Sequence, residues 1–200
     1  MQGEPMQGEP MRRCVSPDSA ALADAVRALR DGQVIACPTE AVWGISCDPH
    51  SDAAVARLLR LKARDPAKGL IVVAACMDQL APWLDGLDYA LYAPLRASWP
   101  GPVTWLVPDN GFAPALVRGD HTSVALRVTD HPGMQALCEA FGGPLVSTSA
   151  NRAGEPPAMS AADARALFGE ALGAVVPGEL GEYPRPSQIR DLASGRVLRR

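Results

Sequence analysis

The stretch Gly69-Leu70-Ile71-Val72-Val73-Ala74 is the clearest strand in the sequence, and it decides the fold class. It is apolar on both faces, and strands of that kind lie in the middle of a sheet covered on both sides. Helical and strand patterns alternate around it. Strands are expected at 34–37, 42–47, 103–107, 124–128, 145–149, 174–176, 187–192 and 196–199. Helices are expected at 17–31, 52–64, 78–84, 89–98, 131–141 and 161–168. The alternation predicts an α/β fold with an open, twisted sheet, mostly parallel or mixed parallel/antiparallel, and flanking helices.

Length and composition favour a single domain. The chain has 200 residues, near the upper end of the usual range of about 100–200 for one domain, and 48% of them are hydrophobic. The start repeats Met-Gln-Gly-Glu-Pro, which cannot bury apolar surface, so residues 1–13 are predicted to be a disordered tail and 14–200 the domain. The net charge of −3 argues against binding nucleic acid by bulk positive charge, but leaves a local basic groove open.

The cysteines and the lack of long apolar runs indicate the cellular compartment of the protein. Five cysteines, an odd number with no CxxC spacing, argue against a disulfide framework or a zinc site. Four lie among apolar residues and are expected to be buried free thiols: Cys37, Cys47, Cys76 and Cys138. No run approaches the roughly 18 apolar residues of a membrane span, and the start lacks a signal-peptide pattern. The predicted location is the cytoplasm, with no membrane association.

Lys62-Ala63-Arg64 ends the helix that Ser51 caps. Cations at a helix C-terminus favour the helix dipole, and this structural role is the simpler interpretation. A functional interpretation rests on Pro66, which disfavours helical geometry at the residue before it. If the chain leaves the helix near Arg64, Lys62 and Arg64 could face one ligand together with Lys68. Arginine and lysine so placed suit phosphate.

A second candidate, Ser147-Thr148-Ser149-Ala150-Asn151, follows Pro144-Leu145-Val146. Ligands of open α/β sheets commonly lie beyond the carboxyl ends of strands, where hydroxyls and an amide can donate to phosphate, ribose or a carboxylate. A solvated turn would also use Ser and Asn. We expect the Lys62–Arg64 and Ser147–Asn151 segments to meet in one nucleotide-binding cleft.

Two further segments are weaker candidates for binding residues. Thr39 and Glu40 could bind a small polar substrate with Trp43 as a wall, although they could equally cap a turn. Ser123 and Arg127 are expected on one face of a strand, where Arg127 could hold a carboxylate or pair with an acid. Neither a P-loop nor a GxGxxG motif is present, and no metal-ligand spacing or Ser-His-Asp pattern stands out.

Six segments in order resemble the YrdC/Sua5 family. They are 38–44 (PTEAVWG), 62–64 (KAR), 68–72 (KGLIV), 99–104 (WPGPVT), 124–128 (VALRV) and 144–151 (PLVSTSAN). Each is weak alone, but the ordered set is specific and extends from about Ser16 to Arg199. The resemblance implies a twisted α/β sheet around a concave, positively lined cleft.

The resemblance also implies an enzyme, a nucleotidyltransferase. Such enzymes join L-threonine, bicarbonate or CO₂, and ATP into threonylcarbamoyl-adenylate and release diphosphate. Partner proteins then transfer the threonylcarbamoyl group to adenosine 37 of tRNAs that read codons starting with A, giving N6-threonylcarbamoyladenosine. Mg²⁺ is expected to arrive with ATP, because no metal ligand can be named in the sequence.

Site residues follow from the resemblance position by position. The family's KxR pair corresponds to Lys62 and Arg64, the expected catalytic residues, and its SxN pair to Ser149 and Asn151. These four are expected to bind ATP, with further ATP contacts at Lys68, Ser123 and Arg199. The threonine-binding positions correspond to Thr39, Ala41, Arg127, Ser147 and Ser187. Many relatives have Thr at position 41, so any contact from Ala41 must come from its backbone.

Two alternatives remain beside the enzyme. One is a tRNA- or rRNA-binding module that uses the same basic groove without adenylation activity. The acidic composition and the absence of interleaved basic and aromatic residues count against it as the sole function. The other is a ligand-binding regulator without turnover, which the intact Lys62, Arg64, Ser149 and Asn151 set disfavours.

Overall fold

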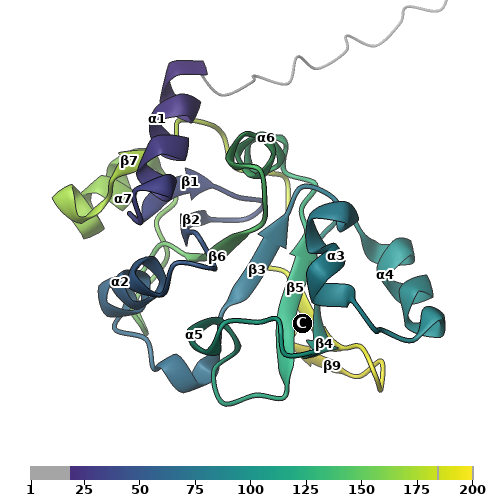
Figure 1. Ribbon diagram of the computed structural model, residues 1–200. Helices are drawn as coiled ribbons and strands as arrows, with labels where there is room; N and C mark the ends of the chain where they lie inside the picture. The colour runs from purple at the N-terminus through teal and green to yellow at the C-terminus, as the bar shows by residue number, and fades with distance from the viewer. Residues whose placement is uncertain (1–18, 184, 200) are drawn as a thin grey trace, which may run out of the picture.

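The computed structural model describes residues 19–183 and 185–199 (Figure 1). The tail predicted at 1–13 lies outside the described residues. The strands are β1 Ile35–Pro38, β2 Trp43–Cys47, β3 Ile71–Ala74, β4 Val103–Pro108, β5 Ser123–Val128, β6 Leu145–Ser149, β7 Ala174–Val175, β8 Gln188–Asp191 and β9 Val197–Arg199. The α-helices are α1 Ser19–Arg30, α2 Asp52–Lys62, α3 Ala81–Leu84, α4 Tyr92–Ser98, α5 Ala115–Arg118, α6 Pro132–Phe141 and α7 Ala161–Phe168. Short 3₁₀ turns lie at Pro66–Lys68, Met77–Leu80, Tyr89–Leu91 and Gly169–Ala171.

One mixed sheet joins the strands in the order β7-β1-β2-β6-β3-β5-β4-β8-β9. The β1–β7, β3–β5 and β4–β8 pairs are parallel. The other neighbours are antiparallel. The mixed sheet is confirmed, while the mostly parallel alternative is wrong for the described strands, because hairpins and antiparallel returns outnumber the parallel crossovers.

The apolar run at 69–74 does form a central strand. β3 lies between β6 and β5, and Val72 and Val73 are both buried. The strand starts at Ile71 because the Leu70 N–H donates to the Val117 carbonyl, outside the sheet. The prediction that this segment occupies the middle of the sheet is confirmed.

One face of the sheet is covered along its length. Val72, Ala74 and Leu126 belong to a core that α2, α3, α4, α5 and α7 complete. This large core fixes the positions of β3 and β5. It also orients the opposite face of these strands.

The opposite face is only half covered. There α1 and α6 pack side by side (Figure 1) on Ile35, Val73 and Leu145, with Met134 and Leu137 supplied by α6. This second core occupies one end of the strands. Beyond it the same face carries polar side chains.

Helix boundaries follow the capping signals in the sequence. Ser51 Oγ accepts the Ala54 N–H at 3.3 Å and starts α2. Ser160 Oγ accepts the Asp163 N–H at 3.1 Å and starts α7. Gly142, with φ of +91°, ends α6. The short α5 was not predicted, since four residues show no helical periodicity.

Three of the four cysteines expected to be buried are so. Cys37, Cys47 and Cys138 are buried free thiols, and burial raises the pKa of each. Cys76 is exposed, so its prediction was wrong. It lies just after β3, where the chain turns outward into a 3₁₀ helix. Within the described residues, no helix is long and apolar enough to cross a membrane.

The last two strands form a hairpin at one edge of the sheet. β8 pairs with β4 on one side and with β9 on the other. All three residues of β9 are exposed, and β8 is only partly buried. This hairpin therefore contributes little to either core.

Candidate functional site

The uncovered part of the second face holds a cavity of about 430 Å³, within the usual range of about 300–1,000 Å³ for ligand pockets. β5 forms part of its floor. Val124 and Leu126 point into the large core, whereas Ser123, Ala125 and Arg127 line the pocket. This alternation along the strand confirms that Ser123 and Arg127 share a face.

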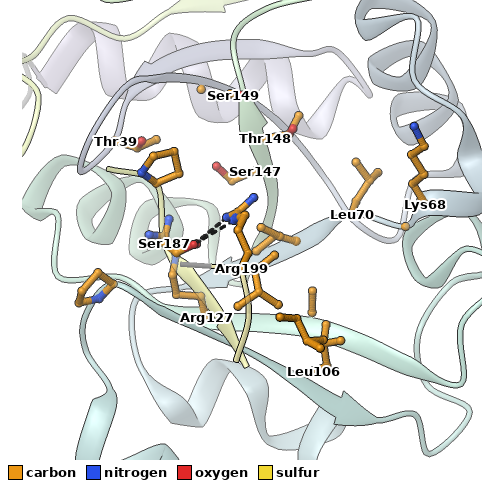
Figure 2. Close-up of a pocket in the computed structure, with 18 of the residues that line it drawn as sticks. Thr39, Lys68, Leu70, Leu106, Arg127, Ser147, Thr148, Ser149, Ser187 and Arg199 are labelled. Atoms are coloured by element: carbon orange, nitrogen blue, oxygen red, sulfur yellow. Dashed lines mark hydrogen bonds between the residues drawn. The ribbon is translucent and has the colours of Figure 1, made fainter. Parts of the chain in front are cut away.

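The carboxyl end of β6 supplies hydroxyl groups. Ser147, Thr148 and Ser149 all line the pocket (Figure 2). Ser147 pairs with Ser46 of β2 on one side and with Ile71 of β3 on the other. The hydroxyl-rich end is therefore held inside the sheet rather than in a free turn.

Lys62 joins α2 to the turn that follows β6. Its Nζ donates to the Ser149 carbonyl at 2.6 Å, and to the Asn151 Oδ1 and carbonyl at 2.8 and 3.2 Å. Ser149 Oγ lies 3.3 Å from the same nitrogen. Burial, and then the charge of Arg64, lowers the pKa of Lys62 to about 8. The Lys62–Arg64 and Ser147–Asn151 segments thus meet directly through this ammonium.

The helix ends where the sequence predicts. Ala63 adopts the left-handed conformation, with φ of 50° and ψ of 42°. The chain then turns, and Arg64 Nε and Nη2 donate to the Gly69 carbonyl at 3.2 and 2.9 Å. Burial lowers the pKa of Arg64. Arg64 and Lys68 both line the pocket, while Lys62 does not.

A close crossing of two loops sets the adjacent wall. Gly69 and Gly119 both have positive φ, +60° and +67°. A Cβ on Gly119 would lie 2.6 Å from the Ala67 carbonyl oxygen and 2.6 Å from Gly69 N. Only glycine allows this approach. The crossing places Arg118, at the end of α5, beside Lys68 in the pocket lining.

The loop between β1 and β2 forms another wall. Thr39 and Ala41 line the pocket, and Thr39 Oγ1 donates to the Val42 carbonyl at 2.7 Å. The hydroxyl of Thr39 thus closes a turn. The prediction that Trp43 forms a pocket wall is wrong, because Trp43 is 2% exposed and belongs to the large core. Alternation turns Gly44, the next residue, toward the pocket instead.

The C-terminal hairpin closes the remaining side. Arg199 Nη2 donates to the Ser187 carbonyl at 2.7 Å (Figure 2). Ser187 Oγ lies 2.8 Å from Thr104 Oγ1. Ser187, expected on the threonine side, and Arg199, expected on the ATP side, are therefore neighbours.

The lining carries an excess of positive charge. Burial, followed by the charges of Arg127 and Arg64, lowers the pKa of Arg199, so these cations act on one another. Among the described residues, the lining contains one carboxylate, Glu40. Its lysine and arginine residues are Arg64, Lys68, Arg118, Arg127, Arg185 and Arg199.

The structure brings most of the expected site residues into one pocket. Those in the lining are Thr39, Ala41, Arg64, Lys68, Ser123, Arg127, Ser147, Ser149, Ser187 and Arg199. Lys62 and Asn151 stand behind this wall and bind each other. Arg118, His121 and Arg185 also line the pocket and were not singled out from the sequence. The one feature of the sequence that marks Arg118 is the glycine that follows it, Gly119, at which α5 ends.

The described residues contain no cluster of three or more His, Cys, Asp or Glu side chains that could hold a metal ion. Glu40, the carboxylate of the lining, is ion-paired with Arg127. The described residues of the lining therefore do not fit a resident Mg²⁺ site.

An open mixed sheet with helices on both faces, and a cation-lined pocket on the half-covered face, defines the class: an α/β protein with a small-ligand site on its sheet. The family model for Sua5, YciO and YrdC, described as telomere recombination, matches residues 27–200. The chain belongs to this family.

Similar proteins share most of the chain. The threonylcarbamoyl-AMP synthase of Chromohalobacter salexigens is 68% identical over 179 residues, which cover 90% of this chain and 96% of that protein. The protein of the same name from Cellvibrio japonicus is 53% identical over 175 residues, 88% of this chain and 93% of its own. A solved structure, P. abyssi Sua5 complexed with L-threonine, is similar with a TM-score of 0.80 and 27% identity. It covers 86% of this chain, which spans 51% of that chain.

Proposed function

We propose that this protein is a threonylcarbamoyl-AMP synthase, which converts L-threonine, bicarbonate or CO₂, and ATP into threonylcarbamoyl-adenylate and diphosphate. The observation that carries the proposal is that one pocket collects residues expected on both substrates. Arg64, Lys68 and Arg199 supply cations for the nucleotide, and Arg127 and Ser187 supply contacts for the amino acid.

The proposed reaction needs no nucleophile from the enzyme. The threonine amine attacks CO₂, forms an N–C bond and loses a proton, which gives a carbamate. A carbamate oxygen attacks the α-phosphorus of ATP, and the bond from that phosphorus to the bridging oxygen breaks, so that diphosphate leaves with the electron pair. Such a reaction depends on alignment and on cations facing the phosphate charge. Arg64 and Lys68 face the pocket for that role.

Lys62 has a different role in this proposal. Its ammonium lies within 3.3 Å of four oxygen atoms of Ser149 and Asn151. It therefore holds the turn after β6 against α2. Ser149 can then contact the nucleotide from the lining, and Asn151, outside the lining, accepts the hydrogen bond of the Ser149 hydroxyl.

The product is a reactive adenylate, which must pass to another protein. We propose that partner proteins transfer the threonylcarbamoyl group to adenosine 37 of tRNAs that read codons starting with A. ATP carries Mg²⁺ into the pocket as part of the substrate.

The test is diphosphate release from ATP in the presence of Mg²⁺, L-threonine and bicarbonate. Release should require both threonine and bicarbonate, and its absence would overturn the proposal. Tight tRNA binding without such turnover would support the RNA-binding alternative.

Paired variants locate the reaction in the pocket. Arg64→Ala should lower turnover by about tenfold or more, because it removes a cation that faces the phosphates. Arg60→Ala is the matched control, since Arg60 is an exposed arginine of α2 outside the lining. Equal activity of the two variants would remove Arg64 from the site.

A further inference from the structure

Arg118 is a cation of the pocket lining that has no role in the reaction described above. It ends α5, and its side chain is 35% exposed. Arg118 Nε lies 3.3 Å from Asp109 Oδ2, and Nη1 donates to the His121 carbonyl at 2.7 Å. Nη2 has no hydrogen-bond partner within the described residues. The guanidinium is therefore anchored through two of its nitrogens, and the third is available to a ligand.

The backbone around Arg118 is fixed on both sides. The carbonyl of the preceding residue accepts the Leu70 N–H at 2.8 Å, and the Asp120 N–H donates to the Ala67 carbonyl at 3.1 Å. These two bonds join the end of α5 to the 3₁₀ turn that contains Lys68 and to the residues that follow that turn. The two cations therefore keep fixed neighbouring positions in the lining.

These two cations lie at one end of the pocket. Arg118 precedes β5 and Lys68 precedes β3, and the two strands are parallel neighbours, so both residues lie at the amino ends of these strands. Arg127 stands four residues after Ser123, the first residue of β5, which is about 13 Å along the strand. The pocket is therefore cationic at both ends of β5.

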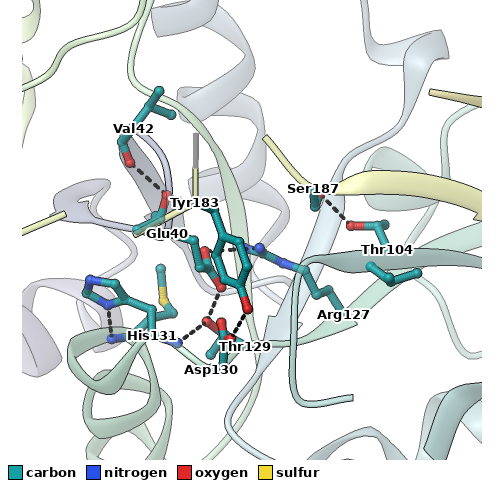
Figure 3. Close-up of polar contacts among 12 residues, drawn as sticks. Glu40, Val42, Thr104, Arg127, Thr129, Asp130, His131, Tyr183 and Ser187 are labelled. Carbon is teal, nitrogen blue, oxygen red and sulfur yellow. Dashed lines mark hydrogen bonds and ion pairs between the residues drawn. The ribbon is translucent and has the colours of Figure 1, made fainter. Parts of the chain in front are cut away.

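The two ends differ in how their cations are paired. Glu40, which lies 3.0 Å from Arg127, belongs to the lining itself (Figure 3). Asp109, the partner of Arg118, lies outside the lining, where its Oδ1 accepts backbone N–H groups of the following loop. A phosphate near Arg127 would meet a carboxylate, whereas Arg118 presents its cation to the pocket with the carboxylate behind it. Polyphosphate is therefore attracted to the amino end of β5.

The side of the pocket formed by the hairpin suits the base of a nucleotide better than its phosphates. Ile189 of β8 and Leu198 of β9 are apolar, and Arg199 donates back to a carbonyl just before β8. Apolar side chains can pack against a nucleobase, but they cannot replace the hydration of a phosphate. The terminal phosphates are thus left to the end of the pocket with Lys68 and Arg118.

We propose that Arg118 binds the terminal phosphate of the nucleotide, beside Lys68. The inference rests on the proposed function, in which the β- and γ-phosphates leave together as diphosphate. Negative charge develops at the oxygen that bridges the α- and β-phosphates, whereas the γ-phosphate is charged before and during the reaction. Arg118 therefore strengthens ATP binding equally in the ground state and the transition state. It is a specificity-determining residue that selects a nucleoside triphosphate over a monophosphate.

Calorimetric titration with ATP and with AMP tests the proposal, with Mg²⁺ present and threonine absent. Wild type should bind ATP more tightly than AMP. Arg118→Ala should weaken ATP binding by about tenfold, because a charge-assisted hydrogen bond to phosphate is lost, and leave AMP binding within about twofold of wild type. In the diphosphate-release assay the KM for ATP should rise by a similar factor, while kcat changes by less than about threefold.

Arg57→Ala is the matched control. Arg57 is exposed on α2 and lies outside the lining, and its replacement changes the net charge by the same amount. The control should bind ATP and AMP as wild type does. Arg118→Lys keeps a cation on a flexible stem, so it should restore part of the preference for ATP.

The possible results separate a phosphate contact from a structural role. Equal weakening of ATP and AMP in Arg118→Ala would overturn the proposal, since Arg118 would then only support the wall. A lysine variant no better than the alanine variant, or a loss in kcat without a rise in KM, would overturn it as well. Failure of wild type to bind ATP overturns the proposed function instead. If Arg118→Ala does not fold, Arg118→Met keeps the aliphatic stem, and the same results are expected of it.

Discussion

The crossing of the loops at Gly69 and Gly119 gives a quantitative prediction for Gly119→Ala. With φ of +67° and ψ of −149°, Gly119 has a backbone conformation that is essentially restricted to glycine, and an L-residue there costs about 1–3 kcal/mol. In addition, the new Cβ would lie 2.6 Å from the Ala67 carbonyl oxygen and 2.8 Å from that of Pro66, and these backbone atoms cannot rotate away. Overpacking of this kind costs about 1–3 kcal/mol more. Gly119→Ala should therefore lower the free energy of unfolding by about 2–6 kcal/mol.

Gly86→Ala is the control, because Gly86 has nearly the same φ, +73°, and a Cβ added there would meet no other atom within 4 Å. It should lose only the conformational part, about 1–2 kcal/mol. Urea unfolding at pH 7 measures both variants. Because the crossing also holds the Gly69 carbonyl that anchors Arg64, the KM for ATP should rise in Gly119→Ala alone. Equal destabilisation of the two variants would refute the steric argument.

Three further predictions concern other elements. Burial lowers the pKa of Lys62 from 10.5 to about 8, so the unfolded chain binds more protons than the folded chain between these pH values. The contribution of Lys62 to the free energy of unfolding should therefore rise with pH over that range. Urea unfolding from pH 8 to 10 should show a larger rise in stability for wild type than for Lys62→Met. Ala63→Gly should stabilise the protein by up to about 1 kcal/mol, because a φ of 50° strains alanine but not glycine. Thermal unfolding measures the change, and a loss of stability would count against strain at this helix end. Trp43→Ala should cost about 3–5 kcal/mol, while Trp43→Phe should leave the KM for threonine unchanged; a changed KM would return Trp43 to the pocket wall.

Local patterns predicted the type of most elements. The apolar run at 69–74 identified the central strand, and Ser51 and Gly142 marked helix ends. Each signal lies within the segment it describes, so one sequence suffices to read it. Strand pairing is different, because it depends on partners far along the chain, and the antiparallel majority left no local mark.

The error at Trp43 has a physical cause. β2 is buried along its whole length, so no alternation of polar and apolar residues marks which face is which. β5 does alternate, and the shared face of Ser123 and Arg127 was predicted correctly. The Lys62–Arg64 and Ser147–Asn151 segments were expected to share a cleft, but the direct hydrogen bond from Lys62 to Asn151, 89 residues apart, was not predicted.

Ligand binding in the pocket should stabilise the hairpin of β8 and β9 against local opening. This hairpin is the least buried part of the sheet, and such segments open at the lowest free-energy cost. Yet Leu198 and Arg199 line the pocket, together with Ser187 just before β8. A ligand that touches them binds the closed hairpin and not the open one, so it must slow amide hydrogen exchange there. Substrate thus acts as a tether, and exchange at this sheet edge reports whether the pocket is filled.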